Sequence, residues 1–321
     1  MLQVRREAPT AGRLGPETAD SVVTTPAVPV AAVSSRVPAR AFLPAAEVAE
    51  REMRGPRQVF WLGWAEQNRA QLRSVLANPR TDEDVSDGLR LAGSLWWFWW
   101  LRGHWAEGRA LLGVVLAAAR VAGESSVWGK ALFGAATLAH AQCDLPLARA
   151  LYEETFAIAR GSRQPLLVAH VLNQLGGVAR DQGRQDAATA LFRRSLRESR
   201  RLGDEWNSGR SLLGLARVAL GRRRLQEAEA LCAECGAVFE ALGATQNAAA
   251  GVLTLGHVRC AQGDSSSARV LFQRGHRLYA SIQSRAGQAL CQFALGDVAR
   301  DEGDDDDALA HYGDRLWTAH A

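Results

Sequence analysis

The stretch that decides the fold is Leu175-Gly-Gly-Val-Ala-Arg-Asp-Gln-Gly-Arg-Gln-Asp-Ala-Ala-Thr-Ala-Leu-Phe192, in which a small residue, an alanine and an aromatic residue follow one another at set intervals. The same pattern recurs along the chain at a constant period. Residues three or four positions apart share one face of a helix, so each period predicts two helices that approach closely at their small residues. The recurring positions are Ala136, Gly176, Ala216, Gly256 and Gly296, then Ala148, Ala188, Ala228, Ala268 and Ala308, then Tyr152, Phe192, Cys232, Phe272 and Tyr312.

Turn residues mark the junction between the two helices of a period. They recur at Gln142-Cys-Asp144, Gln182-Gly-Arg184, Gln262-Gly-Asp264 and Glu302-Gly-Asp304, while Arg222 to Arg224 replace them in the remaining period. A single helix pair cannot bury its apolar face, whereas a stack of pairs buries a continuous core. We therefore expect an all-α array of antiparallel helix pairs.

The pattern resembles the tetratricopeptide motif W-x2-L-G-x2-Y…A-x3-F, which Leu175-Gly176, Ala188 and Phe192 match in order and spacing. Leu172 replaces the leading Trp and Ala179 the Tyr, and the period is 40 residues instead of about 34. The extra residues lengthen either the second helix or the loop between helix pairs. The resemblance implies a right-handed superhelix; a HEAT-like array has a similar period but lacks this spacing.

A second resemblance covers residues 58–321 and rests on Trp64-Ala-Glu-Gln-Asn-Arg69 and on the Trp-rich segment from Leu89 to Arg109. These are similar to the start of the helical-repeat region in bacterial regulators that carry a STAND (NB-ARC-like) ATPase and a LuxR or winged-helix DNA-binding domain. In that family the repeats bind an inducer or a protein partner. This sequence contains neither of the other domains, so two hypotheses remain: a regulator-related sensor, or a stand-alone adaptor without a role in transcription.

The sequence predicts three regions. Residues 1–55 are rich in Pro and Ala and are expected to be disordered. Residues 56–122 are expected to form an N-terminal helical cap with a degenerate first repeat, with helices at 57–76 and 82–101. Residues 123–321 hold five repeats. The aromatic segment Trp96 to Trp105 is interpreted as closing the open end of the stack, with a seam to an ATPase domain as the alternative.

No motif indicates an enzyme, because Walker, His-Glu-x-x-His and Gly-x-Ser-x-Gly patterns are all missing. Cys232-Ala-Glu-Cys235 occupies core positions, which favours packing over zinc or redox chemistry. Asp304 to Asp307 is interpreted as the start of a helix, in preference to a metal site. We therefore expect no cofactor and no metal.

The formal charge of +4 comes from residues of both signs spread along the chain. The arginines of the 193–201 region favour a solvated surface over a phosphate site, so direct nucleic-acid binding is not expected. No apolar run reaches the roughly 20 residues of a spanning helix, and no signal peptide is evident. These observations predict a cytoplasmic protein without a membrane contact.

If the helices pack as in tetratricopeptide arrays, the first helix of each pair lines a concave groove. Its mixture of cations and apolar residues suits a protein or peptide partner with an acidic group, with a small-molecule effector as the alternative. The competing interpretation is an ordinary solvated helix face. The predicted groove residues are Lys130, Phe133, His140, His170, Asn173, Arg180, Arg210, Arg217, His257, Phe293, Asp297 and Arg300.

Overall fold

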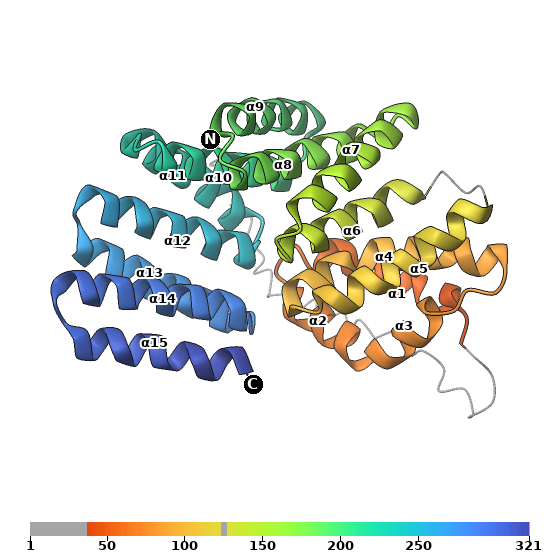
Figure 1. Cartoon of the computed structure of the whole chain (residues 1–321), viewed down its shortest axis with the longest axis horizontal. Coiled ribbons are helices and arrows are strands. Elements are labelled where there is room, and N and C mark those ends of the chain that lie inside the picture. The colour runs from red at the N-terminus through yellow and green to blue at the C-terminus, as the bar shows by residue number, and fades with distance from the viewer. Residues whose placement is uncertain (1–36, 123–126, 321) are drawn as a thin grey trace, which may run out of the picture. The chain divides into compact units, whose positions relative to one another are not determined.

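The structure, a computed structural model, describes residues 37–122 and 127–320, and all regular structure in these residues is helical (Figure 1). The all-α prediction is therefore confirmed. The elements are η1 (Ala39–Ala41), α1 (Leu43–Glu52), α2 (Gln58–Gln67), α3 (Arg69–Leu76), α4 (Asp82–Arg102), α5 (Trp105–Ala122), α6 (Trp128–Ala141), α7 (Leu145–Gly161), α8 (Pro165–Asp181), α9 (Gln185–Leu202), α10 (Glu205–Gly221), α11 (Leu225–Ala241), α12 (Thr245–Gln262), α13 (Ser265–Ser281), α14 (Arg285–Glu302) and α15 (Asp305–His320).

Tight turns join the repeat helices, and each places one residue in the left-handed backbone region. Arg223 adopts a φ of 60° in the period that lacks the usual turn residues. Its amide bonds the carbonyl of Leu220, as the amide of Gly183 bonds that of Arg180. The same backbone hydrogen bonds therefore form in both turns, although a side chain in this conformation costs about 1–2 kcal/mol.

The repeat period is divided nearly equally between two helices. The two helices that contain the stretch from Leu175 to Phe192 are α8, with 17 residues, and α9, with 18 residues. The additional residues relative to the shorter motif therefore extend the helices, and the loops stay short.

Glycines hold the helices close around the recurring aromatic residue, as the spacing predicted. A Cβ built on Gly176 would lie 2.8 Å from the Phe192 ring, and one built on Gly214 of the next pair would lie 2.4 Å from it. Phe192 is 2% exposed and is thus held between α8 and α10. Gly256 with Phe272, and Gly296 with Tyr312, repeat the contact within their own pairs.

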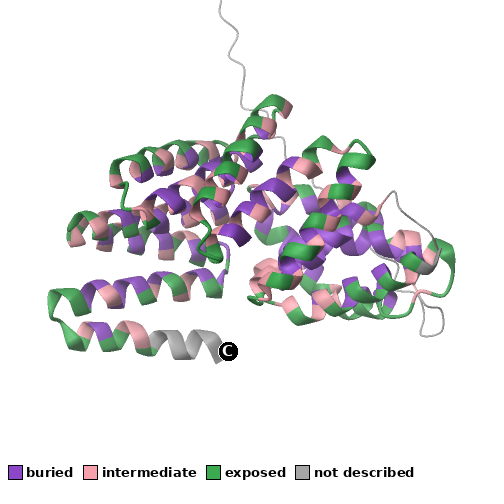
Figure 2. Cartoon of the chain, turned by 45° about the horizontal axis from the view of Figure 1, so that its top comes forward, coloured by how far each residue is buried: buried purple, intermediate pink, exposed green. Residues whose placement is uncertain are grey.

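The first helix of each pair is buried more completely than the second (Figure 2). Buried residues run along α10 from Trp206 to Ala219, whereas α11 buries Ala228, Cys232, Cys235 and Phe239. Each first helix contacts the first helices of neighbouring pairs as well as its own partner. Polar side chains on the first helices are therefore the ones that meet inside the array.

Residues 39–55 correct the predicted extent of the disordered segment, because they form η1, α1 and a turn. Phe42, Ala46, Ala49 and Met53 lie on one face of α1 and are fully buried, and α1 packs against α4. This apolar stripe drives helix formation at the end of a Pro-rich stretch. Residues 1–36 lie outside the described part of the chain.

The other N-terminal helices agree closely with the sequence-based ranges. Helix α4 spans Asp82–Arg102. Thr81 is its N-cap residue, and the Thr81 side chain accepts a hydrogen bond from the Asp84 amide. The range 57–76 is broken at Asn68 into α2 and α3. Helices α1 and α3 pack on α4, and α3 also packs on α5, so α4 and α5 form the first pair of the stack.

Cys232 and Cys235 pack in the core, as expected for their positions in the repeat. They are 4% and 0% exposed, and burial raises the pKa of the Cys235 thiol to about 12. At the start of α15 the Asp304 carboxylate accepts the Asp307 amide at 3.0 Å. Both features are therefore accounted for by packing and capping.

Candidate functional site

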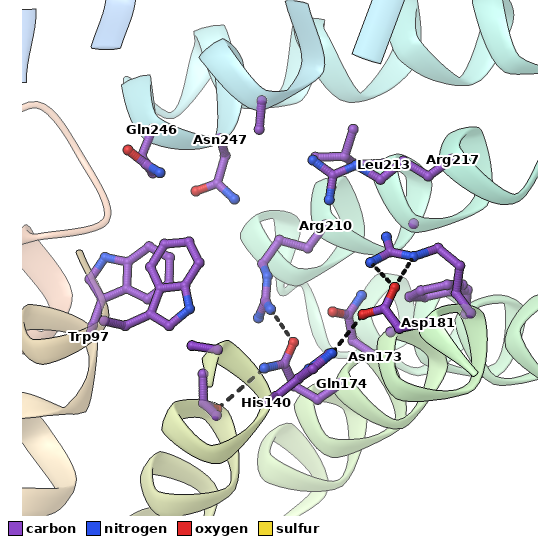
Figure 3. Close-up of a pocket in the computed structure, with 18 residues that line it drawn as sticks. Trp97, His140, Asn173, Gln174, Asp181, Arg210, Leu213, Arg217, Gln246 and Asn247 are labelled. Atoms are coloured by element: carbon purple, nitrogen blue, oxygen red, sulfur yellow. Dashed lines mark hydrogen bonds and ion pairs between the residues drawn. The ribbon is translucent and has the colours of Figure 1, made fainter. Parts of the chain in front are cut away.

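A cavity of about 300 Å³ lies among the first helices α6, α8, α10 and α12, with α4 on its far side (Figure 3). Five of the predicted groove residues line it. Successive first helices contact one another, so side chains from different repeats meet at one place. The five are His140, Asn173, Arg180, Arg210 and Arg217.

The other predicted residues lie elsewhere. Three of them line a second cavity of about 410 Å³ bordered by α1, α4, α6 and α8, namely Lys130, Phe133 and His170. The remaining four are on α12 and α14 and line neither cavity: His257, Phe293, Asp297 and Arg300. Of these, Asp297 accepts a hydrogen bond from the Tyr312 hydroxyl at 2.8 Å.

One carboxylate, that of Asp181, lines the first cavity. His140 Nε2 lies 2.8 Å from Asp181 Oδ2, and Arg180 Nε donates to Asp181 Oδ1 at 2.8 Å. Burial by itself raises the pKa of Asp181, but these two partners outweigh it and hold the pKa below its ordinary value. Asp181 is therefore a carboxylate that offsets the charge of Arg180.

Arg210 has neutral partners only. Its Nη2 donates to Gln174 Oε1 at 2.5 Å, and its guanidinium lies 4.7 Å from the centre of the Trp206 ring. Nη1 is buried without a hydrogen-bond partner. Burial lowers the pKa of Arg210 to about 10, and the carboxylate of Asp204, which is not in ion-pair contact with it, offsets this only in part.

Arg217 is in a similar position two turns further along α10. Its Nε donates to the hydroxyl of Thr254 at 3.3 Å. Burial, together with the nearby charge of Arg180, lowers the pKa of Arg217. Among the described residues neither Arg210 nor Arg217 forms an ion pair with a carboxylate, and Asp204 and Asp181 act on them only from a longer distance, so the cavity carries an excess of positive charge.

Several lining residues were not in the predicted set. Trp97 and Trp100 stack face to face with their ring centroids 4.7 Å apart, and the Trp-rich segment had been interpreted only as a cap or a seam. Gln174 on α8 also lines the cavity. Gln246 and Asn247 lie in the first turn of α12, well before His257, the groove residue predicted on that helix.

The segment Glu50 to Arg57 crosses the face on which the groove was predicted. Glu50 Oε2 lies 2.8 Å from Lys130 Nζ, and Trp97 Nε1 donates to the Met53 carbonyl at 3.3 Å. Pro56 packs against the turn at Gly243, where an added Cβ would lie 3.1 Å from the proline ring. The segment thus reaches from α4 to the turn between α11 and α12.

Arg54 and Trp206 separate the two cavities. The Arg54 guanidinium lies 4.6 Å from the Trp206 ring centre, and Arg210 lies 4.7 Å from the same centre. Trp97 meets Trp206 edge-on at 5.7 Å. The predicted groove is consequently divided, because Arg54 lines the second cavity and Arg210 the first.

His170 gives the fold a pH dependence. Its Nε2 lies 2.6 Å from Asp204 Oδ2, yet burial outweighs this hydrogen bond and lowers the pKa of His170. In the unfolded chain the imidazole takes up a proton near pH 6.5, and the folded chain does so only at lower pH. The free energy of unfolding should therefore fall as the pH drops from about 7 to 5, by at most about 1.4 kcal/mol per pH unit from this residue.

Denaturant unfolding at several pH values measures this effect. His170→Gln is expected to flatten the slope between pH 7 and 5 and to leave the slope between pH 8 and 7 as in the wild type. Equal slopes in both proteins below pH 7 would contradict the assignment to His170.

In residues 37–122 and 127–320, no group of three or more His, Cys, Asp or Glu side chains is arranged to hold a metal ion. Within the same ranges, no helix has the length and apolar character that crossing a bilayer requires.

Two arginines of the 193–201 region form ion pairs with carboxylates. Arg200 pairs with Glu234, and Arg201 Nη2 lies 2.9 Å from Glu198 Oε2. Arg193 and Arg197 are exposed on α9. A charge change at these two positions therefore leaves the lining of the first cavity intact.

Comparison with known proteins identifies the repeat. Residues 168–202, which cover α8 and α9, match the family model of the tetratricopeptide repeat, and the chain therefore contains a tetratricopeptide-repeat region. No curated protein matches the chain.

Solved structures show the same fold at low sequence identity. A Rap protein complexed with competence and sporulation factor is 12% identical, with 88% of this chain and 77% of that chain covered and a TM-score of 0.65. A STAND ATPase with a tetratricopeptide-repeat sensor from Pyrococcus horikoshii is 13% identical, with 87% and 43% covered and a TM-score of 0.54. BtubC from P. vanneervenii is 21% identical, with 66% and 89% covered and a TM-score of 0.52.

Proposed function

We propose that this tetratricopeptide-repeat chain is a non-enzymatic recognition domain that binds an acidic segment of a protein or peptide partner in the cavity lined by Arg210 and Arg217. The observation that carries the proposal is that both arginine side chains are partly buried in the cavity wall and are hydrogen-bonded only to neutral groups. Leaving a charge in this state is costly, and a carboxylate of the partner would offset the cost.

The position of the cavity supports a ligand site over a solvated helix face. Its polar side chains come from four successive first helices and converge on one space, which is the usual arrangement of a binding site. A structural neighbour, the Rap protein, is described as complexed with a competence and sporulation factor. That description concerns the neighbour, and we extend to this chain only the binding of a partner by the repeats.

The finer proposal concerns the biological setting. We propose that the chain is related to the sensor arm of STAND-type regulators, since the Trp-rich segment resembles their repeat region and a STAND ATPase with a repeat sensor has the same fold. The alternative is an adaptor with no role in transcription. An in-frame STAND ATPase encoded beside this chain would favour the first, and its lack would favour the second.

Charge reversal tests the proposed site. Arg180→Glu combined with Arg217→Glu should weaken partner capture by at least about 100-fold, because the contact at Arg217 becomes repulsive and the change at Arg180 leaves the carboxylate of Asp181 without its cation. Affinity capture with mass spectrometry identifies the partner, and titration calorimetry with the purified partner measures its affinity for each variant.

The matched control is Arg193→Glu combined with Arg197→Glu, which makes the same charge change on the exposed face of α9. A partner that binds the control but not the cavity variant supports the proposal, provided that circular dichroism shows both variants folded. Arg217→Gln, which introduces no charge, serves if the double reversal unfolds. Equal binding to the cavity and control variants would show that this cavity is not the site.

A further inference from the structure

Two features of the first cavity specify the kind of segment that would fill it. The first feature is the distance along α10 between Arg210 and Arg217, the two lining arginines without an ion pair. Arg210 and Arg217 are seven residues apart on α10, so they lie on the same helix face with an axial separation of about 10 Å. Both side chains extend from α10 into the cavity (Figure 3). Two separate anionic groups suit this arrangement better than one.

The second feature is the neutral lining opposite and beside the arginines. Gln246 and Asn247 bring side-chain amides to the cavity, and Gln246 Oε1 is buried without a hydrogen-bond partner. The amides of Asn173 and Gln174 also line it, but they already bond Ser211 and Tyr152. A side-chain amide can donate to a peptide carbonyl and accept from a peptide N–H. An extended segment has these backbone groups free, whereas a helix uses its backbone N–H and C=O groups in its own hydrogen bonds. The cavity volume of about 300 Å³ limits the segment to a few residues.

The wall that faces α10 is aromatic. Trp97 and Trp100 stack on each other and close the cavity from the side of α4 (Figure 3). In an extended segment, side chains at i and i+2 point to one face, about 6.6–6.8 Å apart, and the side chain between them points to the other. Residues i and i+2 can therefore face the arginines while residue i+1 packs against the indoles.

We infer that the cavity recognises an extended tripeptide of the pattern acidic–apolar–acidic, with one carboxylate on each of Arg210 and Arg217 and the apolar side chain on Trp97 and Trp100. The long arginine side chains span the difference between their axial separation and the spacing of the two acids. This inference rests on the proposed function and narrows it to a sequence pattern in the partner.

Three capped pentapeptides test the pattern by titration calorimetry: Ser-Glu-Leu-Glu-Ser, its isomer Ser-Glu-Glu-Leu-Ser, and the uncharged Ser-Gln-Leu-Gln-Ser. The first should bind at least about tenfold more tightly than each of the others, because a charged hydrogen bond in a water-poor site is worth more than a neutral one. The isomer keeps composition and charge but directs its two acids to opposite faces.

Arginine variants then locate the two contacts. In Arg210→Gln and in Arg217→Gln, the peptide Ser-Glu-Leu-Gln-Ser or its mirror arrangement Ser-Gln-Leu-Glu-Ser should bind as well as the doubly acidic peptide, since one carboxylate has lost its partner. Arg193→Gln on the exposed face of α9 is the control and should keep the full preference.

Equal affinity for the acidic peptide and its isomer would overturn the inference, and so would no measurable binding of the Ser-Glu-Leu-Glu-Ser peptide at millimolar concentration. The peptide test of the pattern and the partner-binding test of the proposed function can fail independently of each other. A partner whose binding needs Arg180 and Arg217, combined with peptides that show no spacing preference, would retain the site and reject the pattern.

Discussion

Trp206→Ala should lower the free energy of unfolding by about 3–5 kcal/mol, the range for truncating a large buried aromatic side chain. Trp206 is 7% exposed and lies between the guanidinium groups of Arg54 and Arg210, with Trp97 against its edge. Its removal would leave a cavity and would also remove the neutral π-face between two partly buried cations. The measurement is denaturant unfolding followed by circular dichroism.

Hydrogen exchange gives this prediction a local signature. Residues 53–57 should exchange much faster in the variant, because Arg54 loses its contact on α10 and the segment is then held mainly by the α4 side. Trp206→Phe keeps a ring in place and should show a smaller loss of stability and a smaller change in exchange. An alanine variant as stable as wild type, with unchanged exchange at 53–57, would contradict the role given to Trp206.

Gly214→Ala should be the next most damaging change, although alanine is the better helix former. A Cβ at this position would lie 2.4 Å from the Phe192 ring, and Phe192 is already held on its other side by Gly176. The ring cannot retreat, so α10 must move away from α9. Overpacking of this kind costs about 1–3 kcal/mol, and the shift would also displace the two arginines on α10.

Gly236→Ala is the matched control, because it makes the same substitution inside helix α11 where nothing lies within 4 Å of the new methyl group. It should stabilise the protein by about 0.5–1 kcal/mol through the lower backbone entropy of the unfolded chain. Thermal and denaturant unfolding of both variants provide the comparison. If the two substitutions change stability in the same direction, the close approach at Phe192 does not limit the packing.

The sequence predicts the repeat architecture well because its signals are local. The pattern from Gly176 through Ala188 to Phe192 lies within one helix pair, and the turn at Gly183 uses backbone hydrogen bonds between neighbouring residues. Even the turn at Arg223, which lacks the usual residues, follows from the length of the period. Helical geometry alone relates such spacing to structure.

The candidate site is predicted only in part. Five of the twelve groove residues meet in the cavity because they lie on three adjacent first helices, α6, α8 and α10. The two indoles opposite them, Trp97 and Trp100, come from the Trp-rich segment. The composition of that segment indicates that its side chains are buried, but it does not indicate which helices they contact. Residues 50–55 fall in the range predicted to be disordered, and the role of the segment Glu50 to Arg57 depends on contacts with residues far away in the chain.

What the sequence by itself determined is the unit: a helix pair of constant length, its tight turns, and the small residues that bring its helices together. What only the tertiary structure decided is which distant surfaces meet, such as Trp97 against Trp206 and Arg102 against the Gln283 carbonyl. The physical reason is that the unit is set by interactions within a few helical turns. The meeting of distant units depends on small rotations between successive pairs, which accumulate along the stack and are not encoded at any one position.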